Sequence, residues 1–249
     1  GNTYSGVVIE GAGTDSNLVT SNGIGLGTDL ATNLPNGNDG VLIKDGPSNT
    51  FIGGASNTGN FITYNEYSGV NITRGGSGTN VGWNIIGSNR IDGVAIYSTT
   101  GCWINNNTIA SNLLAGVRVN GVPAAGNLIW PNSITGNGSK GIWLQNGGNF
   151  GIARPTITSA SQWAASGTTC ASCQVALYSD AGDEGQVYHD IVLADASGHW
   201  SYAGGPLVGP NLTATASDIS GNTSEFSAPA AISGGSKYKV YVPLNSRNR

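Results

Sequence analysis

The sequence repeats one short pattern in Gly93-Val94-Ala95-Ile96, Gly116-Val117-Arg118-Val119 and Gly141-Ile142-Trp143-Leu144, and the copies start 23 and 25 residues apart. Between successive copies lie shorter apolar segments that follow an asparagine, such as Asn107-Thr108-Ile109 and Asn132-Ser133-Ile134. Each repeat therefore contains three short strands and three polar corners. A unit of this length cannot bury an apolar face alone, so the pattern predicts a solenoid in which each coil covers its neighbours.

The same pattern occurs three more times nearer the start, in Gly6-Val7-Val8-Ile9, Gly40-Val41-Leu42-Ile43 and Gly69-Val70-Asn71-Ile72. We therefore expect about six coils, with a longer loop around residues 27–38. Because side chains alternate along a strand, the pattern predicts two internal columns. The columns are Val7, Val41, Val70, Val94, Val117 and Ile142, and Ile9, Ile43, Ile72, Ile96, Val119 and Leu144. Asparagines two positions before an inward Ile are expected to form inward ladders or occupy left-handed corners.

The composition limits the possible partners of this 249-residue chain. Charged residues make up 10%, against about 25% in an ordinary domain, and the net charge is -4. With no basic run, this balance argues against binding to nucleic acid or to an anionic membrane surface. No apolar stretch is long enough for a membrane span. The chain contains no Met, so we expect a processed mature protein that has lost a signal or pro-segment.

Residues 24–54 carry a family resemblance. The run includes Gly27-Thr28-Asp29, Asn36-Gly37-Asn38-Asp39-Gly40-Val41 and Asn49-Thr50-Phe51-Ile52-Gly53-Gly54, and it resembles bacterial secreted proteins with right-handed parallel β-helix repeats. The resemblance implies an all-β solenoid domain over residues 1–152. It indicates the fold and says little about activity.

After about Phe150 the period stops and short apolar runs alternate with Gly, Pro and Asp clusters, which predicts a small antiparallel β-sandwich over residues 153–233. The expected strands are 155–158, 173–178, 187–194, 200–202 and 212–216. The runs Ala194-Asp195-Ala196-Ser197-Gly198-His199-Trp200 and Asp218-Ile219-Ser220-Gly221-Asn222 are similar to those of immunoglobulin-like modules that follow such β-helices in bacterial surface proteins.

The last segment, residues 234–249, alternates apolar and polar positions like a strand, with Tyr238, Val240, Val242 and Leu244 on one face. A lone strand is not stable in water. We therefore expect this assembly tail either to dock on its own chain or to add to an exposed sheet edge of a neighbouring copy.

Few residues of the solenoid suggest catalysis. Parallel β-helices that cleave acidic polysaccharides need paired carboxylates or a calcium site beside a basic residue. In the outward columns of the most regular sheet, the predicted register places one carboxylate, Glu10, among twelve positions. Glu10, Lys44, Asp45 and Arg74 gather on the first coils, where a solvated ionic patch is favoured over an active site. The outward columns are Val8, Leu42, Asn71, Ala95, Arg118 and Trp143, and Glu10, Lys44, Thr73, Tyr97, Asn120 and Gln145.

Other candidate residues favour structural roles. Glu66, Arg90 and Asp92 fall in predicted corners, and His189 and His199 lack neighbours at metal-ligand spacing. The chain therefore offers no predicted metal or cofactor site. The acidic cluster Asp180, Asp183 and Glu184 predicts a hairpin turn rather than a calcium loop.

The cysteines point to an oxidising compartment. Cys170-Ala171-Ser172-Cys173 lacks the second pair that a zinc site needs and the βαβ pattern of a redox domain. The similar surface modules carry a Cys pair at this strand entrance, which implies a local disulfide between Cys170 and Cys173. Cys102 is expected to be free and buried.

Five Asn-x-Ser/Thr sequons are possible glycosylation sites, although several arise by chance in a chain rich in Asn, Ser and Thr. They are Asn71, Asn106, Asn137, Asn211 and Asn222.

Three functions from different classes remain open. The first is a non-enzymatic extracellular structural or adhesive protein, including a self-assembling fibre subunit with head-to-tail or donated-strand contacts between copies of itself. The second is a β-helix polysaccharide lyase or hydrolase that uses Glu10 or Asp45. The third is a module that binds surface glycans on Tyr97 and Trp143.

Overall fold

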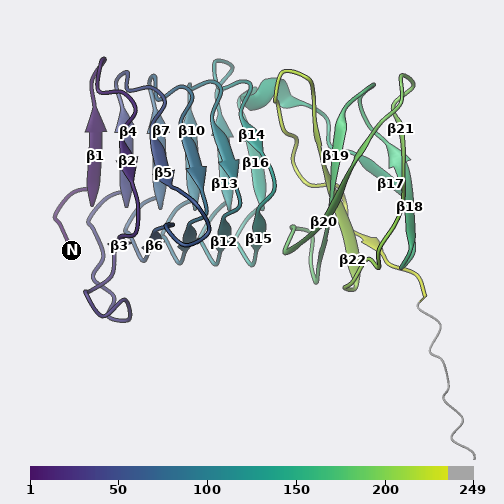
Figure 1. Cartoon of the computed structure of the whole chain (residues 1–249), viewed down its shortest axis with the longest axis horizontal. Helices are drawn as coiled ribbons and strands as arrows, with labels where there is room; N and C mark the ends of the chain where they lie inside the picture. The colour runs from purple at the N-terminus through teal and green to yellow at the C-terminus, as the bar shows by residue number, and fades with distance from the viewer. Residues whose placement is uncertain (235–249) are drawn as a thin grey trace, which may run out of the picture.

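The computed structural model describes residues 1–234, and the predicted assembly tail with Tyr238, Val240, Val242 and Leu244 lies outside the described residues. The described chain is all-β, apart from one short 3-10 turn, η1 (Gly148–Gly151). A solenoid of three parallel sheets is followed along the long axis of the molecule by two antiparallel sheets (Figure 1).

The first sheet of the solenoid consists of β1 (Val7–Glu10), β4 (Val41–Lys44), β7 (Val70–Thr73), β10 (Val94–Tyr97), β13 (Val117–Asn120) and β16 (Ile142–Gln145). The second sheet consists of β2 (Leu18–Val19), β5 (Phe51–Gly53), β8 (Asn80–Gly82), β11 (Trp103–Asn105) and β14 (Leu128–Ile129). The third sheet consists of β3 (Gly23–Ile24), β6 (Phe61–Thr63), β9 (Ile85–Gly87), β12 (Thr108–Ala110) and β15 (Ser133–Thr135). The expected six coils are therefore too many, since the second and third sheets have five strands each and β16 starts a turn that the solenoid does not complete.

The register of the first sheet confirms the two predicted internal columns. Val7 pairs with Val41, Val41 with Val70, and Val117 with Ile142. The column that begins with Ile9 is paired in the same register, as Ile9 with Ile43 shows. Most of these side chains are fully buried. The alternation of inward Val or Ile with outward residues therefore determines which face of each strand enters the core.

Asparagine ladders run along two corners of the solenoid. In the first ladder, Oδ1 of each Asn accepts both the backbone N–H and the side-chain N–H of the Asn one coil earlier. This ladder consists of Asn22, Asn60, Asn84, Asn107 and Asn132. The second consists of Asn2, Asn36, Asn65, Asn89, Asn112 and Asn137. The left-handed corner positions fall to the residues before ladder asparagines, such as Trp83 with φ 63° and Ser111 with φ 58°.

The antiparallel part of the chain forms two sheets that share a second core. One sheet holds β17 (Thr156–Ala160), β18 (Ala164–Thr168) and β21 (His199–Ala203), and the other holds β20 (Val187–Leu193), β19 (Gln174–Asp180), β22 (Asn211–Ser217) and β23 (Ala230–Ala231). Trp200 of the first sheet packs with Leu177 and Leu212 of the second in this core. Strand β18, with the sequence AASGT, was not expected because its small residues carry no apolar alternation. The immunoglobulin-like assignment stays a prediction.

The antiparallel sheets cover the end of the solenoid. Ile134 and Gly185 exchange two backbone hydrogen bonds of 2.9 Å, and the Ile129 N–H donates to Thr223 Oγ1 at 3.0 Å. Phe226 joins the solenoid core. The apolar columns of the last coil therefore continue into the antiparallel unit instead of ending in solvent.

Candidate functional site

The outer face of the first sheet carries one buried ion pair. Arg118 donates from Nε to Asp92 Oδ2 at 2.7 Å and from Nη2 to Asp92 Oδ1 at 2.9 Å, and its Nη1 donates to Gln145 Oε1 at 2.6 Å. The guanidinium carbon lies 4.4 Å from the ring centroid of Trp143. Asp92 is fully buried and also accepts the Ala115 N–H at 2.9 Å. Both carboxylate oxygens of Asp92 and three of the five side-chain N–H groups of Arg118 are thus hydrogen-bonded, which offsets part of the cost of burying the pair.

The four charged residues predicted to gather on the first coils do so as two separate ion pairs. Lys44 Nζ lies 3.1 Å from Glu10, and Arg74 Nε lies 2.6 Å from Asp45. The hydrogen bond from Arg74 lowers the pKa of Asp45. Partly exposed ion pairs of this kind contribute about 0–1 kcal/mol.

Every other solenoid carboxylate also has a partner. Arg90 Nε lies 3.1 Å from Glu66, and Asp39 accepts hydrogen bonds from the Ser68 N–H and from Asn71 Nδ2. Burial raises the pKa of Asp39. Asp15 and Asp29 bind nearby hydroxyl and backbone groups. Each carboxylate of the described solenoid therefore has at least one ion-pair or hydrogen-bond partner.

A column of outward side chains, four of them apolar, follows the outer face of the second sheet. Its members are aligned by the strand register and are Leu18, Phe51, Asn80, Trp103 and Leu128. Leu18 is 66% exposed, Phe51 45% and Trp103 57%. Phe51 and Trp103 are two coils apart, which at about 4.8 Å per coil places them about 10 Å from each other. We call these five residues the aromatic column after its two aromatic members, Phe51 and Trp103, between which Asn80 lies.

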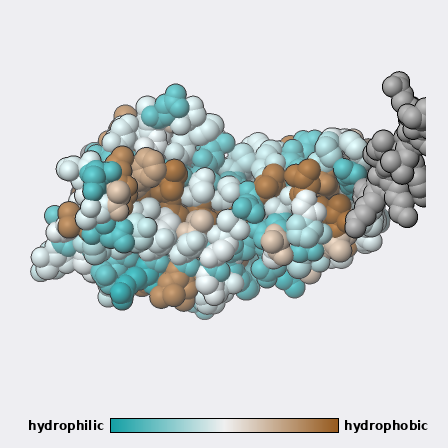
Figure 2. All heavy atoms as spheres, turned by 90° about the horizontal axis from the view of Figure 1, so that it is seen from below, coloured by the Kyte–Doolittle hydropathy of each residue, from teal (hydrophilic) through white to brown (hydrophobic). Residues whose placement is uncertain are grey.

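A small cavity lies beside the aromatic column, at the corner between the second and third sheets. It has a volume of about 240 Å³ and is lined by Trp83, Tyr188, Asn106 and Thr108, among other residues. Trp83 is 41% exposed. Seen from below, apolar residues gather in separate patches over the solenoid and over the antiparallel unit (Figure 2).

Amide groups lie within and beside the aromatic column. Asn105 Nδ2 donates to Asn80 Oδ1 at 3.0 Å, and Asn106 Nδ2 donates to Asn105 Oδ1 at 2.9 Å. These three residues are partly exposed. The face thus combines flat apolar rings with hydrogen-bonding groups, as in sites that bind amphipathic ligands.

The two aromatic residues predicted as glycan platforms, Tyr97 and Trp143, are only partly exposed, and glycan binding by them stays a prediction. Trp143 is half-buried because the Arg118 guanidinium covers its ring, and Tyr97 is also half-buried. Phe51 and Trp103 are more exposed and were not predicted as candidate platforms, although the sequence contains a signal for their exposure. Each directly precedes an inward Ile, so the period-2 rule places both on the outside.

The cysteines and histidines lie apart from this face. Cys170 and Cys173 form a disulfide with a Cα–Cα distance of 5.4 Å, and Cys102 is free and buried. His189 Nε2 lies 2.8 Å from Ser179 Oγ, and His199 Nδ1 lies 3.8 Å from Asp195. Both histidines therefore contact the antiparallel unit alone.

The acidic cluster lies at the end of β19, where Asp180 is the last residue, and in the loop that leads to β20. Asp180 Oδ2 accepts from Thr135 Oγ1 at 3.0 Å, and Glu184 Oε2 accepts the Asn137 N–H at 3.2 Å. Two of the three acidic residues thus bind the last solenoid coil. Burial raises the pKa of Glu184.

The sequon asparagines all use the side-chain nitrogen as a hydrogen-bond donor. Asn71 donates to Asp39 Oδ2 at 3.1 Å, and Asn222 donates to Asp218 Oδ2 at 2.8 Å. The remaining sites, Asn106, Asn137 and Asn211, donate to Asn105 or to backbone carbonyls. Glycosylation at these sites stays a prediction.

The chain belongs to the right-handed β-helix family, because the family model described as right handed beta helix region matches residues 1–159. No curated protein matches the sequence. Among solved structures, the chain is similar to a crystal structure of a mutant of the periplasmic alginate epimerase AlgG, with 18% identity and a TM-score of 0.42. The match covers 59% of this chain and 43% of the epimerase chain. In residues 1–234, no helix has the length and apolarity needed to cross a membrane.

Proposed function

We propose that this protein is a non-enzymatic, extracellular adhesive β-helix that binds neutral glycan chains along the aromatic column. The observation that carries the proposal is the exposure of Phe51 and Trp103 in one register on a rigid sheet. Sugar rings have apolar faces and polar edges. Aromatic side chains stack on such faces, and the amides of Asn80 and Asn105 are placed to bind the hydroxyl groups.

Other features of the molecule support this proposal. The solenoid carboxylates are engaged in ion pairs and hydrogen bonds, which disfavours the alternative of a polysaccharide lyase or hydrolase. The Cys170–Cys173 disulfide suits an oxidising, extracellular compartment. A parallel sheet fixes the spacing of outward side chains, so ligand binding requires little reorganisation.

The test is affinity electrophoresis of the wild-type protein in gels that contain neutral polysaccharides of different linkage. Trp103→Ala should weaken the retardation about fivefold, since one stacked aromatic contact contributes about 1 kcal/mol. Trp163→Ala is the matched control, because Trp163 lies outside the solenoid and is also 57% exposed. Equal retardation of both variants, or none for the wild type on any polysaccharide, would refute the proposal. Release of reducing or unsaturated sugar ends from the same gels would instead favour the enzyme.

We also infer from the sequence that copies of this chain assemble through the tail. Residues 235–249 contain four of the ten basic residues of the chain and none of its fourteen acidic residues, so the tail carries charge opposite to that of the remainder. Deletion of residues 237–249 should abolish any polymer seen by electron microscopy. An unchanged polymer after this deletion would refute the donated tail.

A further inference from the structure

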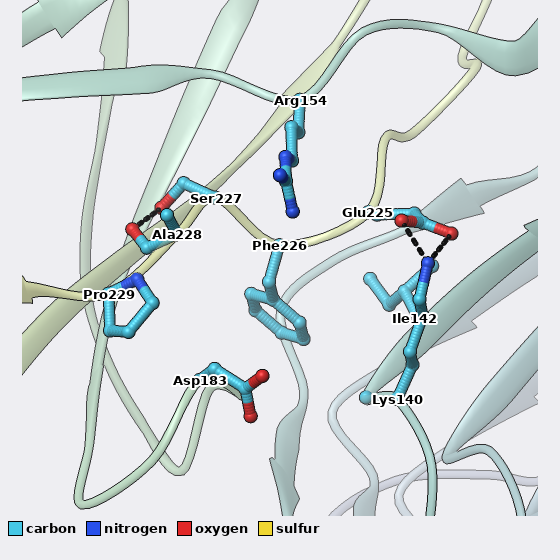
Figure 3. Close-up of a pocket in the computed structure, with 10 residues that line it drawn as sticks. Lys140, Ile142, Arg154, Asp183, Glu225, Phe226, Ser227, Ala228 and Pro229 are labelled. Atoms are coloured by element: carbon cyan, nitrogen blue, oxygen red, sulfur yellow. Dashed lines mark hydrogen bonds and ion pairs between the residues drawn. The ribbon is translucent and has the colours of Figure 1, made fainter.

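A cavity of about 280 Å³ opens where the last solenoid coil meets the antiparallel unit. Lys140 contributes from the solenoid end, Arg154 from the link before β17, Asp183 from the loop between β19 and β20, and Glu225 and Phe226 from the segment between β22 and β23 (Figure 3). A second cavity of about 300 Å³ shares Arg154 and Glu225 with the first. The charged side chains therefore surround a space large enough for a small molecule.

Two of the four charges in this cavity neutralise each other. Lys140 Nζ lies 2.6 Å and 2.8 Å from the two carboxylate oxygens of Glu225, and Glu225 Oε1 also accepts the Leu144 N–H at 3.1 Å. This pair links the solenoid to the antiparallel unit. The Lys140 ammonium group and the Glu225 carboxylate already bind each other, so we do not assign them to a ligand.

The other two charges have no ion-pair partner among residues 1–234, and they do not pair with each other. In Figure 3, Arg154 and Asp183 lie on opposite sides of the Phe226 ring, and both reach toward the space beside it. A free guanidinium fork is suited to a carboxylate, and a free carboxylate is suited to an ammonium group. The same cavity thus offers one group that can bind a carboxylate and one that can bind an ammonium group.

The backbone on both sides of the cavity is held in place. Asp183 precedes Glu184, which is buried and accepts the Asn137 N–H at 3.2 Å. Arg154 precedes Pro155, which is buried and has a fixed φ angle. The two free charges are therefore presented from anchored backbone, which reduces the entropy lost when a ligand binds.

We propose that this cavity binds a small zwitterion of the amino acid class, whose carboxylate pairs with Arg154 and whose ammonium group pairs with Asp183. A ligand with both charges leaves the cavity neutral, whereas an anion or a cation alone leaves one charge without a partner. Phe226 and Ile142 line the same cavity and offer apolar contact to the carbon chain between the two charges.

The test is NMR titration of the ¹⁵N-labelled protein with glycine, β-alanine, 4-aminobutyrate and 6-aminohexanoate, and with hexanoate and hexylamine as single-charge probes. At least one zwitterion should bind with a Kd of about 1 mM or tighter and about tenfold tighter than either single-charge probe. Arg154→Ala and Asp183→Asn should each weaken it about tenfold, and raised salt should weaken it in the wild type. Arg90→Ala, which removes an exposed cation that does not line the cavity, should change nothing.

Three results would overturn the proposal. They are the absence of binding by every zwitterion, equal binding of hexanoate or hexylamine, and unchanged binding in both cavity variants. Circular dichroism spectra and melting curves that match those of the wild type are required of each variant, so that loss of binding is not loss of fold. Arg154→Lys keeps the charge and loses the planar fork, and it should retain weaker zwitterion binding.

Discussion

Replacing Asn84 with alanine removes one step from the middle of the first asparagine ladder. Asn84 is 1% exposed. Its Oδ1 accepts the Asn60 N–H at 3.0 Å and Asn60 Nδ2 at 2.9 Å. Its Nδ2 donates to the Ile52 carbonyl at 2.8 Å and to Asn107 Oδ1 at 3.0 Å. The methyl side chain of alanine can form none of these hydrogen bonds.

The cost follows from the groups that lose their partners. The Asn60 backbone N–H and the Ile52 carbonyl would lose these bonds in a place that water does not reach. A buried polar group left unsatisfied costs about 1–3 kcal/mol, so Asn84→Ala should lower the free energy of unfolding by about 2–6 kcal/mol. Asn80→Ala should cost within about 0.5 kcal/mol, because Asn80 is half-buried on the outer face and makes one amide contact, with Asn105.

Urea denaturation followed by circular dichroism measures the difference between the two variants. The midpoint of Asn84→Ala should fall well below that of Asn80→Ala, with a similar dependence on urea. Hydrogen exchange should show faster exchange of the Asn60 amide in Asn84→Ala alone. Equal midpoints for the two variants would mean that the ladder does not stabilise the coils, and the reasoning would be wrong.

Two further predictions concern buried titratable groups. Burial raises the pKa of Glu184 in the folded chain. The stability that the protonated Glu184 side chain contributes is therefore fully present below the pKa of this group in the unfolded chain, and it is lost as the pH rises through its higher pKa in the folded chain. Glu184→Gln should therefore raise the Tm relative to wild type more at pH 7.5 than at pH 4.5, and a pH-independent difference would contradict this origin. Burial raises the pKa of Cys102 to about 12, so its thiol should resist iodoacetamide in the native protein and react after denaturation, as mass spectrometry would show.

The solenoid could be predicted from the sequence because its period is local. The outward or inward direction of Val94, Ala95 and Ile96 depends only on alternation along one strand, and the next coil repeats it 23 residues later. The number of complete coils could not be predicted, because it depends on where the antiparallel unit replaces the next coil. Strand β18 was missed because its small residues are selected by packing against the neighbouring sheet and not by an apolar pattern.

The candidate sites depend on contacts that the sequence does not specify. Period 2 places Trp103 on the outside, but only the register across three strands shows that Phe51 shares its column. Trp143 is also outward, yet Arg118 covers it. The cavity at the junction could not be predicted from the sequence, because Arg154 and Asp183 line it together with Lys140 and Ile142 only after the antiparallel unit docks on the solenoid.

The direction in which the hydrogen bonds of the second asparagine ladder run gives a reason why the antiparallel unit docks on the last coil of the solenoid. Each Asn donates its N–H groups toward the next coil, so the ladder ends with unused donors at the last coil and unused acceptors at the first. Whatever covers the last coil must therefore supply acceptors. The antiparallel unit does so, since Glu184 Oε2 takes the place of the next Asn and accepts the Asn137 N–H. Glutamine at this position supplies the same acceptor without a buried charge, so the Glu184→Gln comparison also tests whether polarity or charge holds the two parts together.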